Sequence, residues 1–221
     1  MRRDKRMLAA DGGTLLERQV EHVAPLFDRV LIALGNGKPT SEVSRVVERV
    51  LSRFPGKVAT VHDKRAGLGP LEAVRSVLEG VSVPWVFFLA VDLPTVHAPL
   101  IEWLSEVAQR KGVLGCVPQW GARLEVAYAV YHRELRPSIE PLLSKGAGVS
   151  KGAGSLRALA SVRGVERLVL DREAASRRLF GRSLPPPALE AELGRIFANL
   201  NTPADYERWC RGASAPDRDR K

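Results

Sequence analysis

Residues 85–94 read Trp85-Val86-Phe87-Phe88-Leu89-Ala90-Val91-Asp92-Leu93-Pro94, the most apolar strand-like run of the chain, followed at once by a carboxylate. A short apolar run that ends in a turn signal is typical of a strand buried in a sheet. An unpaired charge at the end of such a strand is costly, so we expect a cation or hydrogen-bond donors to meet Asp92. The alternative is that Asp92 shapes the turn with Pro94, a common structural use of aspartate.

Strand-like runs alternate with helical segments on both sides of this stretch, which favours an α/β fold. We predict a doubly wound, mostly parallel sheet with helices on both faces. The expected strands are 29–34, 57–62, 85–91, 113–118, 125–132 and 165–171. The expected helices are 14–27, 41–54, 70–80, 99–111, 137–145, 155–162 and one that begins near Thr202.

The breaks between these elements are too short to separate two cores, so we predict a single domain over residues 1–210. Residues 144–148 (Ser-Lys-Gly-Ala-Gly) recur as residues 150–154, which we interpret as a duplicated loop rather than a phosphate-binding one. Pro185-Pro186-Pro187 indicates a turn or a stiff connection. Residues 211–221 form a charged tail that we expect to be disordered.

The composition limits the classes of partner. A formal net charge of +9 attracts polyanions, but the sequence has no dense basic run with interleaved aromatics, so small phosphorylated ligands rank above nucleic acid. No apolar run approaches the roughly 18 residues that cross a bilayer, and no apolar segment follows the charged start as in a signal peptide. We therefore expect a cytoplasmic protein. Cys116 and Cys210 lack metal-ligand spacing, and Cys116 is expected to be a buried thiol.

Two further polar residues follow expected strands as Asp92 does. Asn36 comes after residues 29–34 and Asp63 after residues 57–62, and ligands of open α/β sheets bind beyond the carboxyl ends of the strands. Gly69-Pro70-Leu71 begins the helix expected at 70–80. Glycine allows close approach of backbone to a ligand, and a helix N-terminus favours anions. Taken singly, each feature can equally be an ordinary turn.

In combination these residues resemble the nucleotidyltransferase family that contains the molybdenum cofactor guanylyltransferases. The resemblance rests on Asp63, Gly69-Pro70-Leu71, Asp92-Leu93-Pro94 and the segment Phe197-Ala198-Asn199-Leu200-Asn201-Thr202-Pro203-Ala204-Asp205. That last segment is similar to the family's characteristic ending, phenylalanine-x-asparagine-x-asparagine-threonine-proline-x-aspartate. Gly121-Ala122-Arg123 is similar to its glycine-arginine hairpin, but Glu125-Val126 stands where a proline-leucine pair is usual.

The resemblance implies transfer of GMP from GTP to molybdenum-molybdopterin, with release of pyrophosphate. It implies Lys5 and Asp92 as catalytic residues, with Mg²⁺ held by Asp92. The implied nucleotide-binding residues are Lys5, Asn36, Asp63, Gly69, Pro70, Leu71 and Asp92, and those on the pterin side are Asn199 and Asn201. For the asparagines, capping of the last helix is the structural alternative. Molybdoenzymes or their chaperones are further partners in this reading, whereas nucleic acid and membranes are not.

Two other functions stay open from the residues alone. One is a related enzyme with another nucleotide or acceptor, such as a molybdenum cofactor cytidylyltransferase, because Leu93 and Pro94 do not separate the two. The other is a non-catalytic binding protein on the same scaffold.

The resemblance also extends to the N-terminus, where Met1-Arg2-Arg3-Asp4-Lys5 is similar to a family segment reading arginine-methionine-glycine-x-aspartate-lysine. In the family, a strand and a glycine-rich loop that holds the nucleotide phosphates come before it. We expect that the reading frame was started at an internal methionine and that the native protein is longer. The alternative is a degenerate relative that does not transfer nucleotides.

Overall fold

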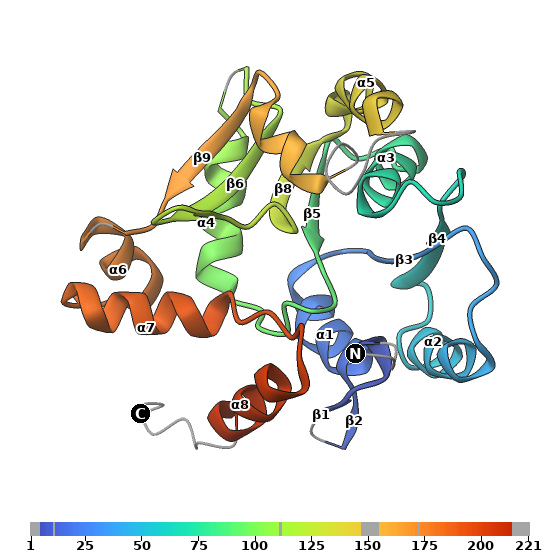
Figure 1. Ribbon diagram of the computed structural model, residues 1–221, viewed down its shortest axis with the longest axis horizontal. Helices are drawn as coiled ribbons and strands as arrows, with labels where there is room; N and C mark the ends of the chain where they lie inside the picture. The colour runs from blue at the N-terminus through green and yellow to red at the C-terminus, as the bar shows by residue number, and fades with distance from the viewer. Residues whose placement is uncertain (1–4, 11, 111, 147–154, 172, 214–221) are drawn as a thin grey trace.

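The computed structural model describes residues 5–10, 12–110, 112–146, 155–171 and 173–213, and helices and strands alternate along it (Figure 1). The strands are β1 (Ala9–Ala10), β2 (Gly13–Thr14), β3 (Val30–Leu34), β4 (Val58–His62), β5 (Trp85–Leu89), β6 (Gly115–Trp120), β7 (Arg123–Leu124), β8 (Tyr128–His132) and β9 (Val165–Val169). The α-helices are α1 (Leu15–Val23), α2 (Ser41–Arg53), α3 (Pro70–Gly80), α4 (Ala98–Ala108), α5 (Arg136–Gly146), α6 (Glu173–Phe180), α7 (Pro186–Ile196) and α8 (Pro203–Ala213). The 3₁₀ turns of the described residues are η1 (Lys5–Met7), η2 (Ala24–Leu26), η3 (Arg133–Leu135) and η4 (Leu156–Ser161).

The α/β class is confirmed, but the strand pairing is mixed rather than mostly parallel. β3 pairs in parallel with β4, and β9 in parallel with β6. β8 lies between β5 and β6 and is antiparallel to both. The chain passes from β6 to β8 through the short hairpin strand β7, and such a short connection permits only an antiparallel return, since a parallel one needs a crossover of a dozen or more residues.

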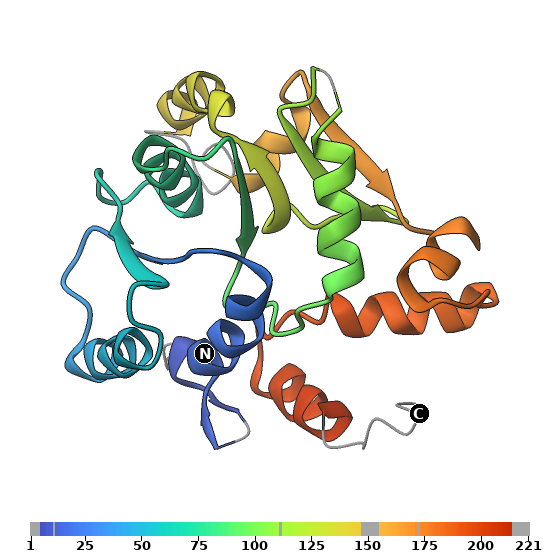
Figure 2. The same ribbon diagram turned by 180° about the vertical axis from the view of Figure 1, so that it is seen from behind.

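Helices cover both faces of the sheet around β5, as predicted. One face packs against α4, α6 and α7 and the other against α3 and α5, and Figure 2 shows α4 lying across β6 and β8. Alternate side chains of β5 serve the two faces: Phe87 and Leu89 pack into the first core, Val86 and Phe88 into the second. This alternation explains why residues 85–89 are apolar throughout.

Local signals set several boundaries where the sequence predicts them. Thr14 caps α1 through a capping box with Glu17, in which each side chain bonds to the backbone of the other. α3 covers the predicted residues 70–80 and begins with Pro70 at its first turn. Cys116 is fully buried, as expected, and burial raises the pKa of its thiol to about 12.

Some predictions for the C-terminal third of the chain need correction, and others concern residues outside the described part of the chain. Pro185-Pro186-Pro187 is not merely a connection: Pro185 is the N-cap of α7 and Pro186 its first residue, because proline fits the first helical turn, which needs no backbone donor. The helices α6 and α7 were not expected. α8 continues to Ala213, so residues 211–213 are helical rather than part of a disordered tail. Residues 147–154, which hold most of the repeat, and residues 214–221 lie outside the described part of the chain.

In the described residues, no helix combines the length and the apolar character required to span a membrane.

Candidate active site

Three of the predicted site residues meet beyond the carboxyl end of β5. The ammonium group of Lys5 lies 2.8 Å from the carboxylate of Asp92 and donates to the side-chain oxygen of Asn201 at 2.6 Å. These residues come from the start, the middle and the end of the chain. The Lys5 and Asp92 side chains are 28% and 24% exposed, so the pair is accessible to a ligand. The cation expected beside Asp92 is therefore Lys5 itself.

The C-terminal segment 197–205 is hydrogen-bonded to the backbone of Asp92. The amide of Leu200 donates to the carbonyl of Asp92 at 2.9 Å, and the Leu200 side chain is fully buried against Leu8 and Leu15. Thr202 caps α8, since its hydroxyl accepts from the amide of Asp205. Asn201 is thus not the capping residue and directs its side chain to Lys5 instead.

A second predicted pair lies at the carboxyl ends of β3 and β4. The side-chain amide of Asn36 donates to the backbone carbonyl of Asp63 at 2.9 Å, and the Asp63 amide donates to Leu34 of β3. Burial raises the pKa of the Asp63 carboxyl, and the negative charge of Glu72 raises it further. Asn36 therefore fixes the backbone of Asp63 rather than its carboxyl group.

The loop from Asp63 to Gly69 is anchored by a buried carboxylate that sequence reasoning missed. Glu72, on the first turn of α3, is fully buried and accepts from the backbone amide and the guanidinium of Arg65 and from the guanidinium of Arg75. Arg75 holds the pKa of Glu72 down at about 2. The spacing of Glu72 and Arg75 by three residues is a helical ion-pair signal, but it does not reveal burial.

Gly69, Pro70 and Leu71 form the N-terminus of α3, as predicted. Gly69 is the N-cap with φ +68°, a left-handed conformation that favours glycine. Pro70 lines a large cavity, whereas the Leu71 side chain is fully buried in the core, which leaves only its backbone for a ligand.

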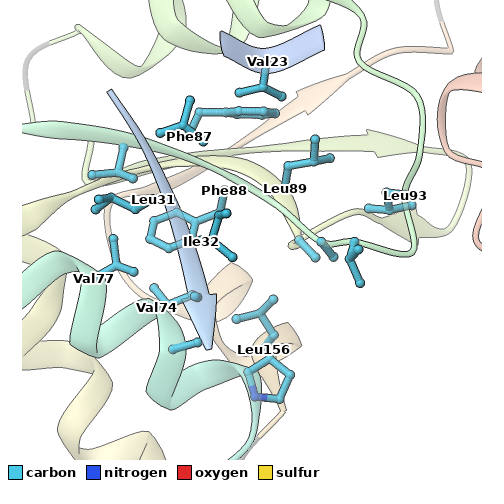
Figure 3. Close-up of a pocket in the computed structure, with 18 of the residues that line it drawn as sticks. Val23, Leu31, Ile32, Val74, Val77, Phe87, Phe88, Leu89, Leu93 and Leu156 are labelled. Atoms are coloured by element: carbon cyan, nitrogen blue, oxygen red, sulfur yellow. The ribbon is translucent and has the colours of Figure 1, made fainter. Parts of the chain in front are cut away.

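That cavity has a volume of about 1250 Å³ and extends along β5 to Leu93 (Figure 3). Pro70, Asp92 and Asn199 line it together with Glu125 and Arg123. Among the described residues, no hydrogen bond or ion pair joins Asn36 and Asp63 to the group around Asp92. The structure therefore holds two separate polar clusters, one after β5 and one at the carboxyl ends of β3 and β4, which form a sheet of their own.

Two more residues near Asp92 were missed. The Gln19 side chain donates to the carbonyls of Ala90 and Leu93, at 2.9 and 2.8 Å, and so braces the turn that carries Asp92. Burial raises the pKa of the Glu125 carboxyl, and the charge of Asp92 acts in the same direction. Sequence separations of more than 70 residues hide the first contact, whereas Glu125 was visible as a departure from the family pattern.

The side chains around Asp92 fit a divalent cation that is coordinated partly by the substrate. They do not fit a cation that is coordinated by protein side chains alone. The described part of the chain contains no group of three His, Cys, Asp or Glu side chains that could hold a metal ion. Mg²⁺ in particular is usually bound through one or two carboxylates plus substrate phosphates, and Asp92 offers one part-exposed carboxylate.

Comparison with known proteins agrees with this geometry. The molybdenum cofactor guanylyltransferase of Syntrophotalea carbinolica is 27% identical over 208 residues, which cover 94% of this chain and 83% of the relative. A probable molybdenum cofactor guanylyltransferase of Opitutus terrae is 32% identical over 66% of this chain and 67% of its own. Among solved structures, molybdopterin-guanine dinucleotide biosynthesis protein A of Archaeoglobus fulgidus superposes with a TM-score of 0.68 at 18% identity, over 95% of this chain and 90% of the other.

The structural likeness at that identity establishes the fold, and the sequence comparison establishes the family. The model of the MobA-like NTP transferase domain matches residues 1–165, well over half of the sequence. This chain therefore belongs to the family of MobA-like NTP transferases, which makes it a nucleotidyltransferase.

Proposed function

We propose that this protein transfers GMP from GTP to the terminal phosphate of molybdenum-molybdopterin and releases pyrophosphate. Relatives named molybdenum cofactor guanylyltransferase support the choice of substrates. The observation that carries the proposal is the meeting of Lys5, Asp92 and Asn201 at one end of β5. This arrangement places a cation, a carboxylate and an amide where ligands of α/β sheets bind.

The reaction requires positioning and charge neutralisation more than covalent help from the protein. An oxygen of the pterin phosphate attacks the α-phosphorus of GTP, and the bond from that phosphorus to the bridging oxygen breaks. Pyrophosphate leaves with the bonding electron pair. In our proposal the Lys5 ammonium binds the phosphates as a point cation and offsets the negative charge that develops on them.

Asp92 and substrate phosphates would together hold Mg²⁺, which would supply Lewis-acid stabilisation of the phosphate oxygens. The ion pair with Lys5, at 2.8 Å, helps to hold the carboxylate of Asp92 in place. Gln19 holds the turn itself through two carbonyls, so the position of Asp92 depends little on the ligand.

In our proposal the nucleotide base binds at the cluster of Asn36 and Asp63, at the carboxyl ends of β3 and β4. The guanine edge carries N–H donors, and the Asp63 carboxyl group offers acceptors for them. Asn36 and Glu72 hold the loop that presents Asp63. Gly69 and Pro70 bring the N-terminus of α3 toward the same edge, where its free amides favour phosphate. Asn199 and Asn201 would then face the pterin.

The direct test measures pyrophosphate release and guanine dinucleotide formation from GTP and molybdenum-molybdopterin with Mg²⁺. Asp92→Asn should lower the turnover rate about 100-fold or more, the usual cost of removing a group that stabilises transition-state charge. The matched control is Asp171→Asn, at an exposed position, which should leave the rate unchanged.

A thermal-shift comparison of GTP with CTP tests the choice of nucleotide, because a ligand that binds the native state stabilises it by mass action. Equal rates for Asp92→Asn and the unmodified protein would contradict the proposed role of Asp92. Stabilisation by CTP and not by GTP would replace guanine with cytosine in the proposal.

A further inference from the structure

Two buried polar side chains of α3 hold the backbone of the loop that follows Asp63. The amide of Lys64 donates to Ser76 Oγ at 3.2 Å, and the amide of Arg65 donates to Glu72 Oε1 at 3.2 Å. Ser76 is 2% exposed and Glu72 is fully buried. These are the first two amides after Asp63, so α3 fixes the path by which the chain leaves that residue.

The negative charge of Glu72 determines how the Ser76 hydroxyl group is oriented. Ser76 Oγ lies 3.2 Å from Glu72 Oε1, and an ionised carboxylate only accepts hydrogen bonds. The single hydroxyl hydrogen therefore points to Glu72, which leaves the lone pairs of Oγ for the Lys64 amide. Arg75 keeps Glu72 ionised, because its guanidinium holds the pKa of this carboxyl at about 2. Glu72 thus acts on one amide directly and on the other through Ser76.

The Arg65 side chain ties the same loop to two helices. Its guanidinium donates to Glu72 of α3 and, at 2.6 and 3.1 Å, to the two carboxylate oxygens of Glu140 of α5. α3 and α5 lie side by side (Figure 1) and pack into one core. The loop is therefore held through backbone and side chain against a rigid pair of helices.

A buried ion-pair network of this kind is weak evidence for a purely stabilising role. Apolar residues often replace buried ion pairs without loss of stability, because the cost of desolvation offsets the attraction between the charges. An apolar side chain at position 72, beside the buried Leu71 and Val74, would need none of these partners. It would leave the loop amide without an acceptor. The network therefore favours the fixing of one loop conformation as the role of Glu72.

Asp63 is the residue that this fixed loop presents. Its amide donates to Leu34 of β3 and its carbonyl accepts from Asn36, so contacts on the side of β3 complement those from α3. Burial and the negative charge of Glu72 both raise the pKa of the Asp63 carboxyl, so Glu72 also acts on that group electrostatically. The direction of a hydrogen bond decides its strength, and the direction of the Asp63 carboxyl depends on the backbone that carries it.

We propose that Glu72 and Ser76 are positioning residues that set the preference for guanine over a purine base that lacks the 2-amino group. This inference rests on the proposed function, in which Asp63 accepts from the guanine edge. Guanine offers two neighbouring donors, N1–H and the 2-amino group, and one carboxylate accepts from both only when it is aligned with the ring. Hypoxanthine offers N1–H alone. Glu72 and Ser76 are too deeply buried to touch the base and act through the loop.

The first test examines the loop in the protein without nucleotide. Ser76→Ala removes the acceptor of the Lys64 amide and leaves the ion pairs of Glu72 in place. Hydrogen exchange of that amide should become at least about 10-fold faster, because local opening governs exchange. Glu79→Gln is the matched control: it bonds to the side chains of Lys64 and Arg75 and, within the described residues, to no backbone amide of the loop. Unchanged exchange in Ser76→Ala overturns the proposal.

The second test compares the dissociation constants of GTP and ITP, measured by calorimetry with Mg²⁺. The unmodified protein and Glu79→Gln should bind GTP about 10-fold or more tightly than ITP, the value of one hydrogen bond to a charged group. In Glu72→Gln and Ser76→Ala this ratio should fall at least about 3-fold, because a misdirected hydrogen bond is weak. Thermal unfolding confirms that each variant is folded at the temperature used. A loss of stability alone would weaken both nucleotides equally, so an unchanged ratio overturns the proposal.

Asp63→Asn separates this inference from the proposed function. If Asp63→Asn lowers the ratio while Glu72→Gln and Ser76→Ala retain it, the base site stands and only the inference is wrong. If Asp63→Asn retains the ratio, or if the unmodified protein binds GTP and ITP equally, Asp63 does not read the base. The base site of the proposed function and the inference then both fall.

Discussion

The most quantitative prediction concerns Glu72, the buried carboxylate of α3. It accepts from Arg75 at 2.8 and 2.6 Å and from the Arg65 guanidinium at 3.2 and 3.0 Å, and its side chain is fully buried. The substitution Glu72→Gln keeps the shape of the side chain but removes its negative charge. The Arg75 guanidinium, which is only 10% exposed, then faces a neutral amide.

Two estimates give the loss of unfolding free energy that Glu72→Gln should cause. The pKa of Glu72 lies at about 2 against an ordinary 4.5, and at 1.36 kcal/mol per pKa unit this difference corresponds to about 3 kcal/mol. Breaking one partner of a buried ion pair costs about 3–5 kcal/mol. We therefore expect Glu72→Gln to lower the free energy of unfolding by about 3 kcal/mol, measured by urea denaturation at pH 7.

The stabilisation that Glu72 contributes depends on pH. Because the folded-state pKa of Glu72 is lower than its ordinary value, the stabilisation is complete above about pH 4.5 and disappears as the pH falls toward 2. The difference between the unmodified protein and Glu72→Gln should therefore be constant from pH 7 to 5 and shrink below that.

Glu140→Gln is the control. It removes a carboxylate that also contacts Arg65 but whose side chain is 52% exposed. Its effect should be clearly smaller, since solvent screens such a pair. If the two variants proved equally stable, or if the Glu72→Gln difference did not change at low pH, the reasoning from burial would be refuted.

Three further predictions use single substitutions. Lys5→Ala should lower the turnover number about 100-fold and weaken GTP binding by less, as measured by steady-state kinetics and calorimetry; normal turnover would contradict its assigned role. Gly69→Ala should cost about 1–3 kcal/mol of stability in thermal unfolding, because its φ of +68° and ψ of −161° suit only glycine. An added Cβ meets no atom within 4 Å, so backbone strain alone acts. Thr14→Ala should cost about 1 kcal/mol by loss of the α1 capping box, and a change below the error of the urea titration would show that the cap is dispensable.

Much of the local structure was predictable because it depends on neighbours in the chain. The apolar run at residues 85–89, the Thr14 cap and the proline at the start of α3 each act over a few residues, and all three elements form as expected. The helix α7 was missed because Pro185-Pro186-Pro187 indicates a break, whereas proline is also a good first residue of a helix.

For the candidate site, the sequence supplied the residue types and the tertiary structure decided their partners. A carboxylate at the end of an apolar strand requires a partner wherever the strand is buried, so Asp92 could be singled out from sequence. That this partner is Lys5, 87 residues away, and that Asn201 joins it rather than capping α8, are facts of the folded chain.

The burial of Glu72 also exists only in three dimensions, as does the separation of β3 and β4 from the sheet of β5. Local sequence encodes secondary structure through short-range sterics and hydrogen bonds, while contacts between distant segments depend on the whole packing arrangement. The sequence by itself thus determined the class of fold and its principal elements, and it supplied the residue types of the candidate site. The tertiary structure alone decided which side chains meet there.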